Sequence, residues 1–102
     1  MPVVRISKGS FRAEDFEKVK ARLDASQESL LPAISGLNGC LHYWAGIDFT
    51  SNTMINVSVW KTLADARQME TLAPMLALAR EFVQLGVVFE WPINNYVTLW
   101  EI

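Results

Sequence analysis

The chain has 102 residues, of which 51% are hydrophobic, and its formal net charge is −2. This length favours one domain, 1–102, and the apolar fraction supplies a core and excludes a disordered chain. The weak negative charge, without any basic run, excludes the electrostatic footprint of a protein that binds nucleic acid or an anionic membrane surface.

The first part of the chain predicts a strand followed by a helix. Residues 3–7, VVRIS, are typical of a short strand, which the sequence KGS ends. From residue 13 the apolar side chains recur on one helical stripe, so we expect a helix over 13–31. Pro32 bends or ends this helix, and the Gly-Leu-Asn-Gly run at 36–39 predicts a turn.

The middle of the chain predicts a β-hairpin. Residues 40–48, CLHYWAGID, form its first strand, residues 49–53 its loop, and residues 54–61, MINVSVWK, its second strand. Thr62 follows directly and can cap a helix that begins near Leu63, because a threonine oxygen accepts from the free N–H groups of a first helical turn.

The last third predicts an interrupted helix and two apolar runs. Pro74 stops the helix early and restarts it, since proline suits a first-turn position. Gly86 ends the restarted segment. Residues 87–91, VVFEW, predict a fourth strand, and residues 96–102, YVTLWEI, form a fifth apolar run.

The order strand, helix, strand, strand, helix, strand predicts an α+β, ferredoxin-like fold with one antiparallel sheet and two helices on one face. Two helices cover only one face, yet several strands are apolar on both faces, as Tyr43 and Trp44 illustrate. A monomer would expose more apolar surface than soluble monomers usually tolerate. We therefore expect a two-fold homodimer through the sheet faces, with residues 96–102 lying along the partner's sheet.

The single cysteine and the apolar segments indicate the compartment. Cys40 has no second cysteine for an internal disulfide, which fits a reducing environment. Residues 1–9 lack the apolar core of a signal peptide. The most apolar window carries Arg80 and Glu81 at its middle, so it predicts a buried helix and a strand instead of a membrane span. We expect a soluble, cytoplasmic protein.

Residues 39–81, GCLHYWAGIDFTSNTMINVSVWKTLADARQMETLAPMLALARE, resemble the antibiotic biosynthesis monooxygenase family of dimeric α/β barrels. The resemblance lies in the Gly-Cys turn, the tryptophan that closes the third strand, and the helix with a proline and a later Arg-Glu pair. It implies oxidation of phenolic or anthrone-like polyketides to quinones by O₂ without a cofactor. The family's pocket pattern N-x-x-x-W falls at Asn56 and Trp60, and its pocket arginine falls at Arg80.

These three residues suit the chemistry that the resemblance implies. Cofactor-free oxygenation needs a carbanion or phenolate that passes an electron to O₂. The amide of Asn56 and the indole N–H of Trp60 can donate to the anionic oxygen, and Arg80 would lower the substrate's pKa. Met69 and Met75 can supply a pliable apolar wall. We expect Asn56, Trp60 and Arg80 to be the catalytic residues and the ligand to be a small apolar aromatic. We expect no cofactor, and the single histidine and single cysteine lead us to expect no metal site.

Each of these residues also has a structural explanation. A strand tryptophan such as Trp60 usually packs in a core, Asn56 can satisfy a buried group or a dimer seam, and Arg80 can be solvated. His42, the only histidine, fits an interface better than a catalytic base. The alternative is therefore a non-catalytic dimeric module that binds a flat ligand or only packs.

Haem degradation is a second activity that the resemblance brings with it, and the residues disfavour it. The helix histidine that would ligate iron falls near Ala79, and the associated tryptophan falls near Met69. The monooxygenase interpretation itself lacks part of the family's pocket. The family's aromatic or imidazole positions fall at Ala45, Gly46 and Ala66, which cannot relay a proton.

Overall fold

The structure, a computed structural model, describes residues 1–102 as strands that alternate with two helical arms. The strands are β1 (Val3–Ser10), β2 (Cys40–Asp48), β3 (Thr53–Trp60), β4 (Val88–Phe89) and β5 (Asn94–Val97). The first arm consists of η1 (Ala13–Asp15), α1 (Phe16–Ala25) and α2 (Gln27–Ser35). The second arm consists of α3 (Leu63–Arg67), η2 (Gln68–Thr71) and α4 (Ala73–Gln84).

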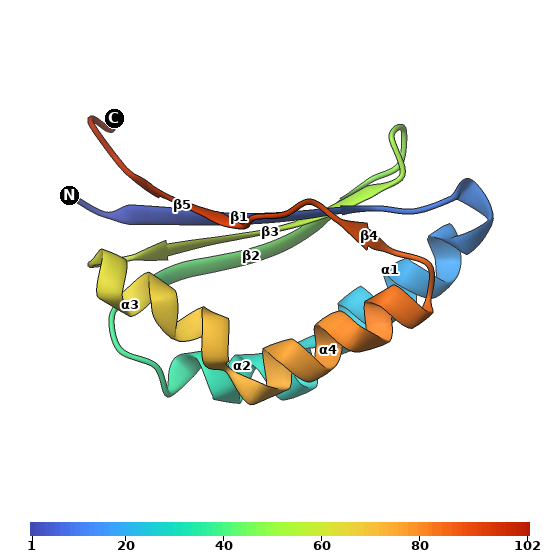
Figure 1. Ribbon diagram of the computed structural model, residues 1–102, viewed down its shortest axis with the longest axis horizontal. Coiled ribbons are helices and arrows are strands. Elements are labelled where there is room, and N and C mark those ends of the chain that lie inside the picture. Colours follow the sequence, from blue (N-terminus) through green and yellow to red (C-terminus); the bar gives the residue numbers. More distant parts are fainter.

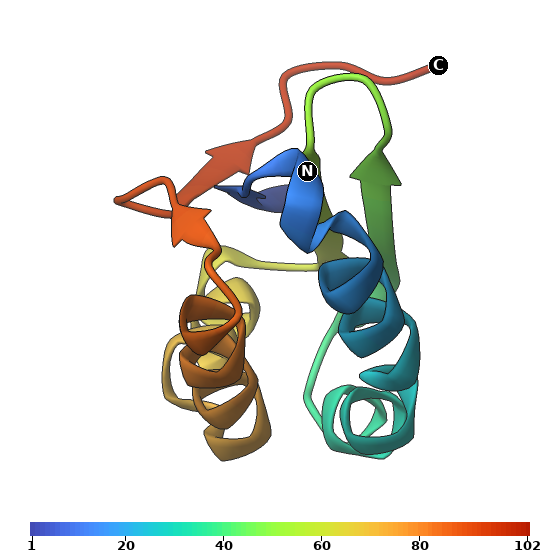
Figure 2. The ribbon, with the colours of Figure 1, turned by 90° about the vertical axis from the view of Figure 1, so that its right-hand side faces the viewer.

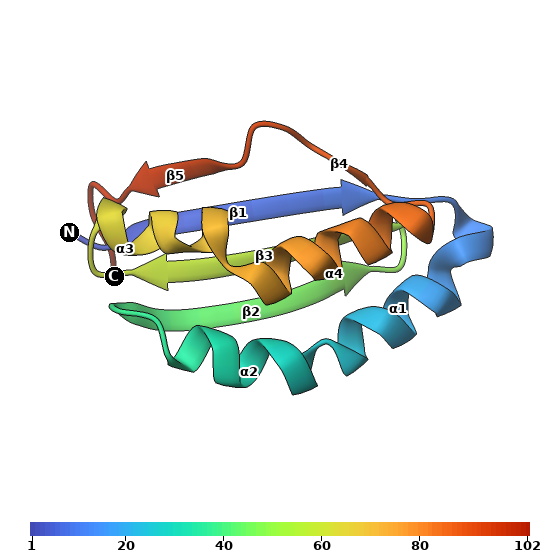
Figure 3. The ribbon, with the colours of Figure 1, turned by 60° about the horizontal axis from the view of Figure 1, so that its bottom comes forward.

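The strands form one antiparallel sheet in the order β2-β3-β1-β4, and β5 also pairs with β1. Both arms cover the same face of this sheet, as Figure 1 shows from the side and Figure 2 from the end. Figure 3 shows the two arms running along the strands. This arrangement confirms the predicted α+β, ferredoxin-like fold. We call the face that the arms cover the inner face and the opposite one the outer face.

Alternation along the strands decides which side chains enter the core. On β3 the buried positions are Met54, Ser58 and Trp60, so Asn56 shares the inner face with them. On β1 the buried positions begin with Val3 and recur at every second residue. The buried apolar side chains that fill the space between sheet and arms are Val3, Phe11, Val19, Leu30, Ile34, Met54, Trp60, Ala66, Met69, Leu78, Phe82 and Val87.

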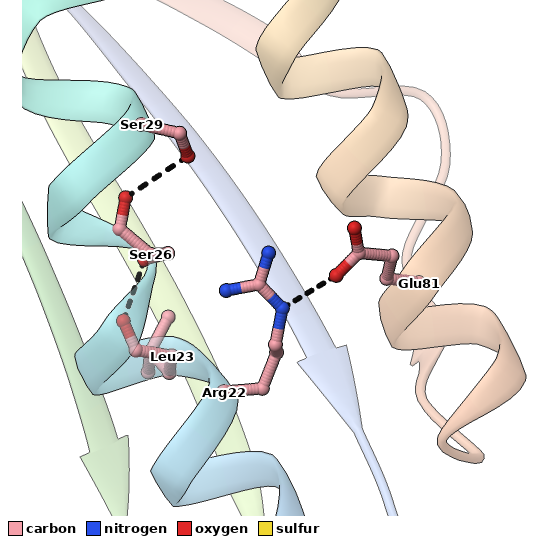
Figure 4. Close-up of polar contacts among 5 residues, drawn as sticks. All are labelled: Arg22, Leu23, Ser26, Ser29 and Glu81. Carbon is pink, nitrogen blue, oxygen red and sulfur yellow. Dashed lines mark hydrogen bonds and ion pairs between the residues drawn. The ribbon is translucent and has the colours of Figure 1, made fainter.

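The first arm breaks at Ser26 instead of at Pro32. The Ser26 hydroxyl donates to the Leu23 carbonyl (Figure 4). The backbone N–H of Ser26 donates to the carbonyls of Arg22 and Leu23. The second helix of the arm then continues through Pro32, which is exposed, so the carbonyl that loses its partner there can bond to water. Of the two alternatives predicted for Pro32, a bend or an end of the helix, the end is therefore wrong.

An ion pair joins the two arms. The guanidinium of Arg22 on α1 donates to the carboxylate of Glu81 on α4, and Figure 4 shows these side chains reaching toward one another. This hydrogen bond holds the pKa of Glu81 below its usual value, because it favours the charged form of the carboxyl. Glu81 thus pairs with the opposite arm and not with its chain neighbour Arg80.

The second arm confirms both predicted helix starts. The Thr62 hydroxyl accepts from the backbone N–H of Asp65 at 3.1 Å and so caps α3. Pro74 lies in the first turn of α4, where its missing N–H removes no helical hydrogen bond. Between them η2 supplies one tighter turn, which places Met69 in the core.

The C-terminal segment pairs with the first strand of its own chain. Residues Asn94–Val97 pair with β1 of the same chain, with Val3 opposite Val97, and the hydroxyl of Thr98 donates to the Pro2 carbonyl. The short β4 leaves the edge of β1 open for this pairing. The expectation that residues 96–102 lie along a partner's sheet stays a prediction. No helix of the structure has the length and apolar character that a bilayer span requires.

Candidate functional site

A cavity of about 190 Å³ lies between the inner face of the sheet and the two arms. The first arm contributes Leu30 and the second arm contributes Leu78. The exposed residues Glu70, Leu76 and Trp91 also line it, so the cavity reaches the surface beside the second arm and the connection between β4 and β5.

Most of the lining is apolar and pliable. Met69 and Met75, which the sequence predicted as an apolar wall, both line the cavity, and Met54 of β3 joins them. Methionine side chains adapt readily to flat aromatic surfaces. An engineered cavity of about 150 Å³ holds benzene. This cavity therefore suits a ligand of one or two rings, and a larger ligand would extend toward the mouth.

Four polar side chains of the sheet interrupt the apolar lining: Arg5, Ser7, Tyr43 and Asn56. We call them the polar wall. Ser7 lies directly opposite Asn56 in the register of β1 and β3. Arg5 and Tyr43 both lie opposite Ser58, one from each side. The polar wall thus crosses three neighbouring strands on the face where an antiparallel sheet usually presents apolar residues.

The Asn56 carboxamide and the Ser7 hydroxyl have no hydrogen-bond partner within the protein. No fully enclosed polar side-chain atom lacks a partner, so these free groups are open to the cavity and not sealed in the core. An amide supplies two donors and one acceptor, and a hydroxyl supplies one donor. Both can therefore bind an oxygen of a ligand.

Tyr43 adds a third neutral donor to the wall. Burial raises the pKa of its phenol to about 12, because a charged phenolate would lose its hydration there. At neutral pH the Tyr43 hydroxyl consequently keeps its proton and can donate to an anion, but it cannot act as a base. The sequence analysis treated Tyr43 only as an apolar strand residue.

Arg5 is the cation of the polar wall. It is 7% exposed, and its Nη1 donates to the Asn95 Oδ1 of β5 at 3.1 Å. The nearest carboxylate, that of Glu70, lies 4.0 Å away, and its side chain is 53% exposed. Burial lowers the pKa of Arg5, and the charge of Glu70 partly opposes this shift. Arg5 escaped the sequence analysis, although its alternation with Val3 and Ser7 assigns it to the buried face.

Trp60 does not line the cavity. It is 0% exposed, and its Nε1 donates to the Ser58 hydroxyl at 2.8 Å, so its one donor is already used inside the core. Four residues along a strand span roughly 13 Å, which carries Trp60 from the site of Asn56 to the end of β3 beside α3. The prediction that the two residues form one pocket wall is wrong for Trp60.

Arg80 does not reach the cavity either. It is exposed on α4, whereas Met75, Leu78, Ala79 and Phe82 of the same helix line the cavity. Leu76, which lines the cavity at its mouth, lies four residues before Arg80 and on nearly the same side of the helix. The Arg80 side chain is nevertheless exposed and does not line the cavity. The one arginine that lines the cavity is Arg5 of β1. A catalytic role for Arg80 stays a prediction.

His42 lies on the outer face. It is exposed, and its ring stacks on that of Trp44 with 5.1 Å between the ring centroids and 12° between the planes. No histidine lines the cavity, whose only carboxylate is that of Glu70 at the mouth. The single histidine therefore has no route to act as a base on a ligand held by the polar wall.

A wider hollow of about 840 Å³ follows the edge strand β2 along the first arm. Its charged lining residues, Lys20, Asp24 and Lys61, are all exposed. Asn56 does not line it. It is a trough along the surface, and such a trough cannot keep water from a reacting group. We therefore place the candidate site in the smaller cavity.

No protein-family model and no curated protein matches the chain. Solved structures do match it over almost its whole length. A candidate antibiotic biosynthesis monooxygenase from Deinococcus radiodurans has a TM-score of 0.76 at 19% identity, with 98% of this chain and 95% of that chain covered. Rv0793 from Mycobacterium tuberculosis has a TM-score of 0.71 at 16% identity, with 99% and 98% covered. SnoaB from Streptomyces nogalater, a cofactor-independent oxygenase, has a TM-score of 0.64 at 15% identity, with 99% and 96% covered.

The chain has the fold of the antibiotic biosynthesis monooxygenases. Within this monooxygenase fold, Asn56 is the one predicted catalytic residue that borders the cavity. The two positions at which the resemblance expects haem-degrading residues, Met69 and Ala79, border it as well, without an imidazole or an indole. No three side chains of His, Cys, Asp or Glu come together in an arrangement that could hold a metal ion.

Proposed function

We propose that this protein is a cofactor-independent monooxygenase that oxidises a small phenolic aromatic with O₂. The observation that supports this most directly is Asn56, whose amide opens into a mainly apolar cavity without a partner in the protein. The fold is shared with SnoaB, a cofactor-independent oxygenase. Fold alone does not assign an activity, so the proposal depends on the polar wall.

The reaction balances without a cofactor. In a phenol such as 1-naphthol, the ring carbon para to the hydroxyl exchanges its C–H bond for C=O, and the phenol O–H becomes the second C=O. One oxygen atom of O₂ enters the ring, and the other leaves as water with the two hydrogens. Four electrons leave the substrate and reduce O₂. The protein has to favour the phenolate, hold it beside O₂ and exclude water.

Asn56 and Tyr43 suit the first of these tasks. Each is a neutral donor in a mostly apolar cavity, where a hydrogen bond to a developing oxyanion is stronger than in water. The methionines Met54, Met69 and Met75 suit the second task, since they can pack on both sides of a flat ring. Trp60 would contribute to the site indirectly, by holding β3 in place.

The test is the Asn56→Ala variant. Loss of one oxyanion donor typically lowers kcat by about a hundredfold. The melting temperature should change little, because the amide has no protein partner to lose. Oxygen uptake and quinone formation with 1-naphthol and anthrone measure the rate, and Asn38→Ala, at an exposed asparagine, is the matched control. A destabilised Asn56→Ala protein with an unchanged rate would contradict the proposal.

The second candidate is a binding module that does not catalyse. The observation in its favour is that no histidine lines the cavity and that the Tyr43 phenol, with a pKa of about 12, cannot serve as a base. This candidate predicts that flat aromatics bind while the parent protein consumes no oxygen above the uncatalysed rate. The same oxygen measurement therefore separates the two candidates.

The proposal includes a homodimer through the outer face. Trp44, Val57 and Ile6 lie side by side there on three strands, and Trp44 is 54% exposed. Leu99 and Trp100 of the C-terminal segment are also exposed. A second copy placed face to face would cover this apolar surface.

The dimer is tested by light scattering at micromolar concentration. We expect about twice the chain mass of 11.5 kDa. Val57→Lys should yield monomers, because it places a charge at the centre of the joined faces, while Lys61→Ala, outside that face, should leave the dimer intact. A parent protein that stays monomeric would contradict the dimer. The cytoplasmic location that Cys40 led us to expect stays a prediction.

A further inference from the structure

The Arg5 guanidinium is a buried charge whose protein partners leave most of its donors unused. A guanidinium has five N–H donors. Here a single hydrogen bond, to Asn95, and one carboxylate at 4.0 Å, that of Glu70, are its only partners. A guanidinium on a buried side chain normally has close, hydrogen-bonded counter-charges, because its desolvation is costly. The 7% exposure of Arg5 therefore calls for a further partner.

The unused donors of Arg5 lie beside other unused donors. Ser7 is two residues further along the same face of β1, roughly 7 Å away. Asn56 lies directly opposite Ser7, and neither side chain has a partner in the protein. All three residues line the same cavity. The Arg5 guanidinium, the Ser7 hydroxyl and the Asn56 amide thus form one cluster of donors, and no buried acidic side chain lies among them.

Glu70 lies close to this cluster but forms no hydrogen bond with Arg5. It stands at the cavity mouth on η2, half its side chain is in water, and 4.0 Å exceeds the N–O distance of a charge-assisted hydrogen bond. A ligand carboxylate that enters the cavity can reach the guanidinium at hydrogen-bond distance and take over the charge that Glu70 only partly compensates.

We infer that the cavity selects ligands that carry an anionic oxygen, such as an aromatic carboxylate, and that Arg5 binds this oxygen in competition with Glu70. The inference rests on the proposed function only in placing the substrate in the same cavity, and it narrows the substrate class to acidic aromatics. The flat ring lies among the methionines, the anionic oxygen faces Arg5, and Ser7 and Asn56 donate to the oxygens nearest them.

The test compares two ligands of one shape. 2-Naphthoate is an anion at pH 7, and 2-naphthamide is its neutral counterpart. Titration calorimetry on the full chain should show naphthoate binding at least tenfold more tightly, since a charge-assisted hydrogen bond is about twice as strong as a neutral one. Arg5→Gln should bring the two dissociation constants to about the same value. Arg67→Gln, at an exposed arginine of α3 that does not line the cavity, is the matched control and should keep the tenfold preference.

Glu70→Gln supplies a second variant with the opposite sign. Because it removes the competing carboxylate, it should tighten naphthoate binding several-fold and leave naphthamide binding unchanged. Glu70 is exposed, so this variant should fold even if Arg5→Gln does not. Equal affinity of the two ligands for the parent, or a naphthoate affinity that Glu70→Gln weakens, would overturn the inference.

The same binding experiment separates failure of the inference about Arg5 from failure of the proposed function. If naphthamide and naphthoate bind equally, the cavity still takes flat aromatics, so the inference about Arg5 falls while the proposed function stands. If neither ligand binds at millimolar concentration, the cavity is not a ligand site, and both fall together.

Discussion

Replacing Trp60 by phenylalanine tests whether this residue supports the fold or contacts the ligand. Trp60 is 0% exposed, and its Nε1 donates to the Ser58 hydroxyl at 2.8 Å. Truncating a buried aromatic to alanine costs about 3–5 kcal/mol, and phenylalanine keeps most of the ring, so we expect about 2 kcal/mol. In a domain of this size 1 kcal/mol lowers the melting temperature by about 4–8 °C, which predicts a decrease of about 8–16 °C.

Ser58→Ala extends the test to the hydrogen bond itself. It leaves the buried indole N–H of Trp60 without an acceptor, at a cost of about 1–3 kcal/mol. The double variant removes both partners, so its loss of stability should fall short of the summed single losses by about 1 kcal/mol. Urea unfolding, followed by circular dichroism at one protein concentration, measures all three variants. Trp91→Phe, at a tryptophan that is 70% exposed and lies at the cavity mouth instead of on the outer face, is the matched control and should be nearly neutral without ligand.

The outcome that would refute this reasoning is specific. If Trp60→Phe melted within about 2 °C of the parent, a margin well below the 4–8 °C expected per kcal/mol, and lost its affinity for naphthamide, Trp60 would be a ligand contact. The core hydrogen bond to Ser58 would then carry little stability, and the cavity would have to extend along β3 to its C-terminal end.

Two further predictions concern pH and haem. The pKa of Tyr43 is about 12 in the folded chain against an ordinary value of 10.0, so the folded state keeps a proton that the unfolded state loses. The stability that this shift provides is complete below pH 10 and is lost as the pH rises through 12. Between pH 10 and pH 12 the parent should lose about 2 kcal/mol more than Tyr43→Phe in urea unfolding. Equal losses would show that the phenol is hydrated. Haemin should bind weakly and without a sharp Soret shift, because no histidine lines the cavity. If the protein bound haemin stoichiometrically with a histidine-ligated spectrum, and His42→Ala abolished that spectrum, the result would favour haem degradation.

The sequence was sufficient to predict the fold because its patterns are local. Strand alternation in 54–61, the cap at Thr62 and the first-turn Pro74 each depend on neighbouring residues, and the structure confirms the cap and the proline position. Alternation also gave the inward direction of Asn56. The same rule assigns Arg5 to the inner face. A charged residue on a strand usually points to water, so the sequence pattern did not predict that Arg5 would be buried.

The parts that the sequence could not predict depend on contacts between distant segments. Which face α4 buries is decided by its packing against the sheet and α2, and this packing turns Arg80 outward. The depth of the cavity along β3 decides whether Trp60 borders it. The strand that Asn94–Val97 joins depends on how much of β1 is left free by β4. The spacing of residues along one element does not determine any of these three features.

Oxygen incorporation tests the central claim most directly. The parent protein, free of added metal and flavin, is incubated with 1-naphthol or 1-hydroxy-2-naphthoate under ¹⁸O₂, and the quinone is analysed by mass spectrometry together with oxygen uptake. The account predicts one ¹⁸O atom in each quinone, one O₂ consumed per quinone, a higher rate with the acidic naphthol, and a rate about a hundredfold lower in Asn56→Ala. Quinone formation no faster than in protein-free buffer, with tight binding of both aromatics, would contradict catalysis and leave a binding module.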